Sequence, residues 1–169
     1  MTIEGDSSDY DLLSAHAEQL AKRFKDKVML TAEVGVRKGL GSKLIMNYIR
    51  PNYSGLHFHV GIDPYGDLIY HHYDKSKKPE KGDYDEDMLL TDFSFMEKYY
   101  YGCEFYYDNK HYVLNDYALV HIDGPHKTTD VIREAVFFAE RSAPGAVFIF
   151  DDWKKFDAPV VRSLMQSYG

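Results

Sequence analysis

The stretch 28–48 constrains the fold most, because its character changes from strand to turn to helix within one short segment. An apolar run of strand type ends at Val34, and three glycines follow it, Gly35, Gly39 and Gly41. A helical pattern begins at Ser42. Glycine has no side chain, so a ligand can lie directly on such a turn, and the turn can adopt positive φ. A strand, a glycine-rich turn and a helix together predict the nucleotide-binding corner of an open α/β sheet.

The rest of the chain alternates between strand and helix patterns. Further strands are expected at 57–62, 118–122 and 146–150, with a weak one at 104–107, and helices at 10–25, 42–50, 88–101, 129–142 and 158–168. Pro144-Gly145 is expected to turn the chain before the last strand. The alternation predicts a Rossmann-like, doubly wound, mostly parallel sheet with helices on both faces. A length of 169 residues is enough for one core but short for two, so 1–169 is expected to be a single domain, with 1–27 as an N-terminal helical segment.

Acidic residues stand at the ends of four expected strands. Glu33 ends the first, Asp63 follows the second, and Asp123 and the pair Asp151-Asp152 follow the later two. An acidic residue at a strand end is often only a turn residue. In a parallel sheet, however, ligands bind at the carboxyl ends of the strands. Several carboxylates at one edge therefore indicate a ligand site there.

The glycine turn is similar to a known motif. The stretch Glu33-Val-Gly35-Val-Arg-Lys-Gly39-Leu-Gly41 resembles the Glu/Asp-x-Gly-x-x-x-Gly-x-Gly motif of class I S-adenosylmethionine-dependent methyltransferases. Asp63 follows where that family carries the acid that holds the ribose hydroxyls. The resemblance implies that S-adenosylmethionine is bound by the turn, Ser42 and two acids, that is by Glu33, Gly35, Gly39, Gly41, Ser42 and Asp63.

The second half resembles a narrower group, the metal-dependent small-molecule O-methyltransferases typified by macrocin O-methyltransferase, which methylates sugar hydroxyls. The matching stretches are Leu119-Val-His-Ile-Asp123-Gly-Pro-His126 and Pro144 through Trp153. The resemblance covers 32–153, with a poorly matched middle at 70–117. It implies that Asp123, Asp151 and Asp152 hold Mg²⁺, that His126 is the catalytic base beside Asp123, and that the acceptor is a small hydroxylated molecule, a sugar or glycoside.

The chemistry of such a reaction agrees with this set. A hydroxyl is a poor nucleophile while it is protonated. A hard divalent cation with oxygen ligands can orient the hydroxyl and lower its pKa. A histidine can then accept the proton at neutral pH. Without a functional role, Asp151-Asp152 would be a solvated strand end and His126 a polar residue before a helix.

Eleven of the fifteen tyrosines fall between Tyr65 and Tyr117, in a charged and variable segment. Tyrosine suits stacking on a sugar ring, so 70–117 is a candidate acceptor wall and lid, although half-buried aromatic packing is the plainer interpretation. His57 and His59 share one strand face and are expected to be structural. Two other functions stay open: a catalytically silent cofactor-binding or assembly module, and an NAD(P)-dependent oxidoreductase.

Composition limits the partners. A formal net charge of −7 argues against a general nucleic-acid or anionic-membrane binder. The N-terminus has no apolar signal segment, and no run is long and apolar enough to cross a membrane. With one cysteine, Cys103, a cytoplasmic protein is expected. Class I methyltransferases usually add two strands after the last helix, and the sequence ends at Gly169 before such a pair. The strand at 146–150 would then be an uncovered edge, which predicts a homodimer or higher homo-oligomer.

Overall fold

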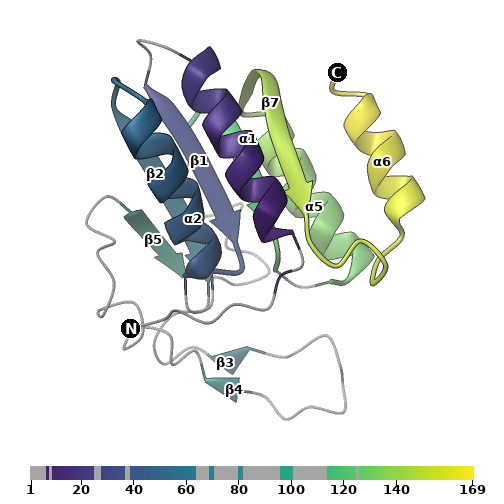
Figure 1. Ribbon diagram of the computed structural model, residues 1–169. Coiled ribbons are helices and arrows are strands. Elements are labelled where there is room, and N and C mark those ends of the chain that lie inside the picture. The colour runs from purple at the N-terminus through teal and green to yellow at the C-terminus, as the bar shows by residue number, and fades with distance from the viewer. Residues whose placement is uncertain are drawn as a thin grey trace.

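The computed structural model describes residues 7, 9–24, 28–36, 39–63, 114–124 and 126–169, and the backbone of three short strands at 69–70, 80–81 and 96–100. A parallel sheet of five strands forms its centre, in the order β5-β2-β1-β6-β7 (Figure 1). These strands are β1 (Met29–Val34), β2 (His57–Asp63), β5 (Met96–Tyr100), β6 (Tyr117–Ile122) and β7 (Ser142–Phe150). The predicted α/β sheet is confirmed. The chain runs outward from β1 to β5 and returns on the other side of β1, so the strand order reverses between β1 and β6, where open sheets bind ligands.

Helices cover both faces of the sheet, as predicted. Helices α1 (Tyr10–Arg23) and α2 (Leu40–Ile49) lie on the near face in Figure 1, and α5 (Thr128–Ala139) lies on the far face, with α6 (Ala158–Gln166) toward the β7 side. A short 3-10 turn, η1 (Arg50–Asn52), ends α2 at Pro51, as expected for a helix that meets proline. One buried apolar cluster joins α1 and α2 to the sheet, and a second joins it to α5.

Side chains along β1 alternate between the two faces of the sheet, and this alternation decides which of them lie beneath α2. Leu30, Ala32 and Val34 belong to the cluster under α5. Because successive side chains of a strand point to opposite faces, Thr31 and Glu33 lie on the α1–α2 side. Both are buried, which a polar side chain tolerates only when it has hydrogen-bond partners. The sequence of β1 therefore places a polar layer beneath the start of α2.

The expected helix at 88–101 is wrong for its described part. Residues Met96–Tyr100 form β5, which pairs in parallel with β2 over His59–Asp63. Aromatic residues such as Tyr99 and Tyr100 favour strands, and the edge of β2 supplies a partner, so tertiary pairing overrides the local helical pattern. The weak strand expected at 104–107 lies outside the described residues.

Two further expectations about the chain change. The strand β7 begins at Ser142, before the expected turn, and Pro144-Gly145 lie in an irregular part of its pairing with β6. Gly145 has φ +76°, which lets the strand bulge there without a full turn. In the charged segment, β3 (Ile69–Tyr70) and β4 (Glu80–Lys81) pair antiparallel, apart from the main sheet. Apart from β3, β4, β5 and residues 114–117, the tyrosine-rich segment lies outside the described residues. Within the described ranges, none of the helices combines the length and hydropathy of a membrane span.

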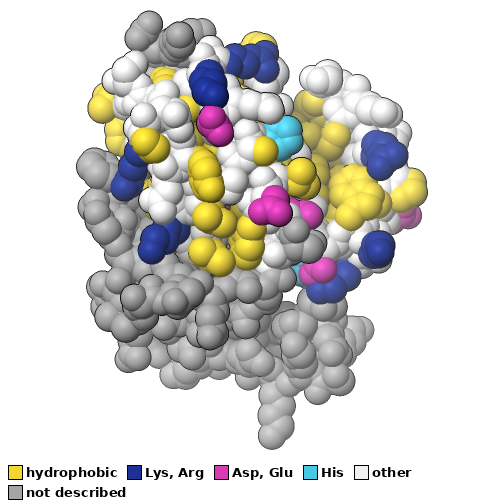
Figure 2. All heavy atoms as spheres, viewed as in Figure 1, with side chains coloured by type: hydrophobic (Ala, Val, Ile, Leu, Met, Phe, Trp, Pro, Cys, Tyr) yellow, Lys and Arg dark blue, Asp and Glu magenta, His cyan; other side chains and the backbone are white. Residues whose placement is uncertain are grey.

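Beside β7 the surface is hollowed. Figure 2 shows hydrophobic side chains exposed between α1 and α6 on the near face. The hollow has a volume of about 460 Å³, and its apolar lining includes Phe148, Phe150, Trp153 and Met165. Arg162 lies over the Trp153 ring, 5.5 Å from its centroid. This aromatic surface follows the edge of the described sheet, since β7 pairs there only with β6.

Candidate active site

The glycine turn adopts the conformation for which its composition is suited. Gly35 has φ +85°, and its N–H donates to the Ile62 carbonyl at 2.9 Å, which holds the turn against the end of β2. A Cβ at Gly35 would lie 2.1 Å from the backbone oxygen of Asp123. The Asp123 N–H donates in turn to the Val34 carbonyl at 2.8 Å. The turn after β1 and the loop after β6 are therefore in direct backbone contact.

Glu33 joins β1 to the start of α2. The Ser42 hydroxyl donates to its Oε2 in a very short hydrogen bond, and His121 Nδ1 lies 2.8 Å from its Oε1. A Cβ at Gly41 would lie 1.9 Å from Glu33 Oε1, so the first turn of α2 fits over this carboxylate only because residue 41 is glycine. Gly39, with φ +84°, is the N-cap residue of α2. Glu33 is only 2% exposed, so its carboxylate contacts protein groups on several sides.

Asp63 ends β2 next to this turn. Glu33 is in register with Gly61, so Asp63 lies two residues further toward the carboxyl edge. Val60 and Ile62 belong to the cluster under α5, and alternation therefore directs Asp63 to the α1–α2 side, as it does Glu33. Asp63 is buried. The structure thus brings together the predicted donor-site residues Glu33, Gly35, Gly39, Gly41, Ser42 and Asp63 around the start of α2.

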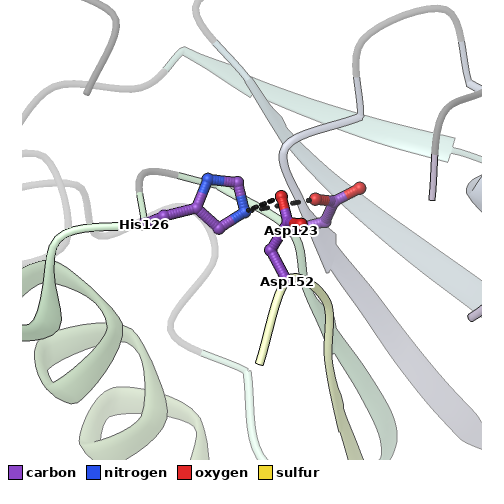
Figure 3. A group of neighbouring side chains, drawn as sticks. All are labelled: Asp123, His126 and Asp152. Atoms are coloured by element: carbon purple, nitrogen blue, oxygen red, sulfur yellow. Dashed lines mark ion pairs between the residues drawn. The ribbon is translucent and has the colours of Figure 1, made fainter. Parts of the chain in front are cut away.

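A second group of side chains lies where β6 and β7 end. Asp123 follows β6, Asp152 follows β7, and His126 precedes α5 (Figure 3). His126 Nε2 lies 3.0 Å from Asp152 Oδ2 and 3.8 Å from Asp123 Oδ1. Figure 3 shows the imidazole pointing toward both carboxylates. Each residue offers one ligand atom within 4.8 Å of the others, so the group could hold a metal ion. Lys155 also forms an ion pair with Asp152.

The composition of this group differs from the expected ligand set. The expected ligands are Asp123, Asp151 and Asp152, with His126 as a separate base. The group that the structure gathers consists of Asp123, His126 and Asp152. Asp151 continues the ladder, with its N–H donating to the Ile122 carbonyl at 3.0 Å, and its side chain is buried. Asp152 has φ +51°, a left-handed conformation that redirects the chain immediately after Asp151. Adjacent residues at a strand end point to opposite faces, so the dipeptide could not supply both carboxylates to one side without such a change.

A buried set of polar contacts extends from Glu33 to β2. His59 Nε2 lies 2.8 Å from Ser42 Oγ, and His59 Nδ1 lies 2.8 Å from Thr31 Oγ1. Thr31 Oγ1 also lies 2.9 Å from His57 Nε2. The sequence interpretation of His57 and His59 as structural neighbours did not include Thr31 or His121. The available signal was a polar residue inside an otherwise apolar buried strand, because such a residue must find partners.

Burial changes the acid–base behaviour of these histidines. Desolvation, with a smaller contribution from the nearby Arg50 charge, lowers the pKa of His57 from 6.5 to about 4. Desolvation, assisted by the charges of His57, His121 and Arg50, holds the pKa of His59 well below its usual range. Both rings are therefore neutral at pH 7 in the folded protein.

We expect the folded state to lose stability as the pH falls from 6.5 toward 4. In this window an unfolded His57 binds a proton and the folded one does not, so acid favours unfolding. One such group changes the free energy of unfolding by up to about 1.4 kcal/mol per pH unit. Urea unfolding of the parent and of His57→Gln across this window measures the effect. The variant should show a shallower slope, and equal slopes would contradict the assigned pKa.

Comparison with known proteins supplies the family. Residues 32–153 match the family model described as a methyltransferase domain. No curated protein matches the chain. Among solved structures, the fold is similar to a chain of the Trypanosoma brucei PRMT1 enzyme-prozyme heterotetrameric complex with AdoHcy, at 14% identity and a TM-score of 0.45. That match covers 83% of this chain and 38% of that chain. The family model spans more than half of the chain, and the chain therefore belongs to the methyltransferase domain family.

Proposed function

We propose that the domain transfers a methyl group from S-adenosylmethionine to a hydroxyl of a small acceptor, a sugar or glycoside, with the help of a divalent cation such as Mg²⁺. One observation carries this proposal. The glycine turn lies against the backbone of Asp123, and Asp123 belongs to the group with His126 and Asp152. A donor on the turn and an acceptor beside the group would therefore be neighbours, as an in-line methyl transfer requires.

The donor half of the proposal rests on the residues around the start of α2. Gly35 and Gly39 give the turn its positive φ angles, Gly41 lets α2 begin directly over Glu33, and Ser42 bonds the same carboxylate. Asp63 ends the neighbouring strand on the same face. An ionised carboxylate accepts from both hydroxyls of a cis-diol, so Asp63 suits the ribose of S-adenosylmethionine.

The acceptor half rests on His126 as the proton acceptor. Its Nε2 lies 3.0 Å from Asp152 Oδ2 and 3.8 Å from Asp123 Oδ1. A proton taken from an acceptor hydroxyl would leave an imidazolium with two carboxylates to pair with, which favours the transfer electrostatically. Asp123 acts here by orienting and balancing the base.

The same residues fit a divalent cation. Two carboxylates and a ring nitrogen within 4.8 Å of one another are a suitable donor set, the oxygens for Mg²⁺ and the nitrogen for a transition metal as well. We propose Asp123 and Asp152 as ligands and Asp151 as a third. Asp151 Oδ1 is buried and has no hydrogen-bond partner within the described residues, so ligation would satisfy it. A bound cation would orient the acceptor hydroxyl and lower its pKa.

Calorimetric titration tests the donor half. We expect S-adenosylhomocysteine to bind the parent protein and NADH not to bind. Asp63→Asn keeps the shape of the side chain and removes its charge, and it should weaken S-adenosylhomocysteine binding by about ten-fold or more, the effect of losing charge-assisted hydrogen bonds. Asp11→Asn, on the exposed start of α1, is the matched control and should bind as the parent does.

The outcomes separate the competing functions. Binding of NADH in place of S-adenosylhomocysteine would favour an oxidoreductase. Binding of S-adenosylhomocysteine without turnover, on a panel of hydroxylated acceptors with Mg²⁺ present, would favour a catalytically silent module. Turnover that a chelator abolishes and Mg²⁺ restores would support the full proposal.

We also propose that a second copy of the chain covers the β7 edge. A strand edge with unpaired backbone groups tends to pair with another chain, and the aromatic hollow beside β7 would be buried by it. A dimer is expected by light scattering at micromolar concentration, and a monomer would contradict this arrangement. The tyrosine-rich segment 70–117 stays our candidate for the acceptor wall.

A further inference from the structure

A continuous path of hydrogen bonds runs along the α1–α2 face of the sheet, beneath the start of α2. It runs from His57 through Thr31, His59 and Ser42 to Glu33, with contacts between 2.8 and 2.9 Å up to Ser42 and a very short final one. Thr31, His59 and Ser42 are fully buried. The path alternates between β2 and β1, passes to α2 at Ser42 and ends on β1 at Glu33. It links the outer end of β2 to the carboxylate under the donor turn.

The direction of every bond on this path follows from its last acceptor. A carboxylate only accepts, so the single hydroxyl proton of Ser42 is donated to Glu33. The oxygen of Ser42 must then accept from His59, which places a proton on His59 Nε2. A neutral imidazole carries one N–H, so His59 Nδ1 accepts from the Thr31 hydroxyl. Thr31 Oγ1 in turn accepts from His57 Nε2.

Neutral histidines are what this order requires. A protonated His59 would present a second N–H to Thr31 and reverse the bonds beyond it. Desolvation keeps the pKa of His59 well below its usual range, so the ring keeps one donor and one acceptor. Hydrogen bonds within such a chain strengthen one another in a low-dielectric interior.

We propose that His59 is a positioning residue of the donor site: through its Nε2–H it orients the Ser42 hydroxyl, which holds the Glu33 carboxylate beneath the start of α2. The inference rests on the proposed function, because its readout is donor binding. Ser42 directly follows Gly41, whose Cα lies against that carboxylate. A change at His59 therefore reaches the donor turn through Ser42 and Glu33.

Two variants of equal polarity test the role. His59→Gln places an amide N–H close to the position of Nε2 and can still donate to Ser42. His59→Asn is shorter, places its amide oxygen close to the position of Nδ1, and can accept from Thr31 but cannot reach Ser42. A merely structural role predicts similar losses for the two. We expect His59→Asn to weaken S-adenosylhomocysteine binding about ten-fold and His59→Gln by no more than about two-fold.

The same pair in a Ser42→Ala background completes the cycle. Without the hydroxyl, the two substitutions should give the same affinity, because the link from residue 59 to Glu33 is already broken. Equal affinities of His59→Asn and His59→Gln with Ser42 present, or a difference that persists in Ser42→Ala, would overturn the inference. If the parent does not bind S-adenosylhomocysteine, both the proposed function and this inference fail. If the parent binds but the variants do not differ as expected, only this inference fails.

A measurement on the unaltered protein remains informative where variants fold poorly. Nitrogen chemical shifts of the His59 ring report which nitrogen carries the proton. The expected result is a protonated Nε2 and an unprotonated Nδ1 at neutral pH. An Nδ1–H tautomer would overturn the inference, because Ser42 would then have no donor from His59.

Discussion

Replacing Gly35 by alanine is expected to lower the free energy of unfolding by about 3–5 kcal/mol. Two causes add. The residue has φ +85°, where a Cβ is strained by about 1–2 kcal/mol. That Cβ would also lie 2.1 Å from the backbone oxygen of Asp123, which cannot move without breaking the end of β6 away from β1. Urea unfolding measured against the parent gives the difference.

Gly145→Ala is the matched control for this change. Gly145 has a similar φ of +76°, but its Cβ would meet the guanidinium of Arg23, the far end of a flexible side chain. We expect a loss confined to the conformational strain, about 1–2 kcal/mol. Equal losses at the two glycines would show that the close approach of Gly35 to Asp123 contributes nothing to stability.

Replacing His126 by glutamine is expected to lower the rate of methyl transfer by at least about 100-fold, the usual contribution of a positioned general base. Glutamine keeps polarity beside Asp123 and Asp152 but cannot accept a proton at neutral pH. Affinity for S-adenosylhomocysteine should stay within about two-fold, since the proposed donor site does not include His126. Initial rates at saturating donor, together with a titration of donor binding, measure both quantities.

The control for His126 is a histidine elsewhere in the fold. His16 on α1 lines the hollow beside β7 and lies outside the group with Asp123. His16→Gln should turn over as the parent does. A full rate in His126→Gln, or a pH–rate profile with its histidine limb unchanged, would assign proton removal to another group.

The arrangement of the sheet was predictable because its strands are locally unambiguous. Residues 29–34 and 117–122 are buried throughout, and their sequences are apolar except at Thr31, Glu33 and His121. The glycine turn and the class I methyltransferase resemblance led to the family that the chain belongs to. The strand at 96–100 was not predictable, because its assignment depends on the free edge of β2, which no local pattern reports. A cytoplasmic location stays a prediction.

The sequence indicates candidate site residues, but it does not indicate which of them make contact. The acids at the strand ends are expected at one edge because parallel strands end there together. The approach of Asp152 to Asp123 and His126 depends on a single left-handed residue, and Asp152 carries no glycine signature that would reveal it. Thr31 and His121 were missed because their partners lie on other elements, and only the folded sheet brings them into contact.

The backbone contact between Gly35 and Asp123 has a thermodynamic consequence. No side chain separates the donor turn from the loop that carries the acidic group, so neither can shift without the other. A ligand on the turn that displaces this contact is therefore expected to alter the affinity of the acidic group for a cation. By linkage the effect would be reciprocal: if the proposed cation changes the affinity for the donor by some factor, the donor changes the affinity for the cation by the same factor.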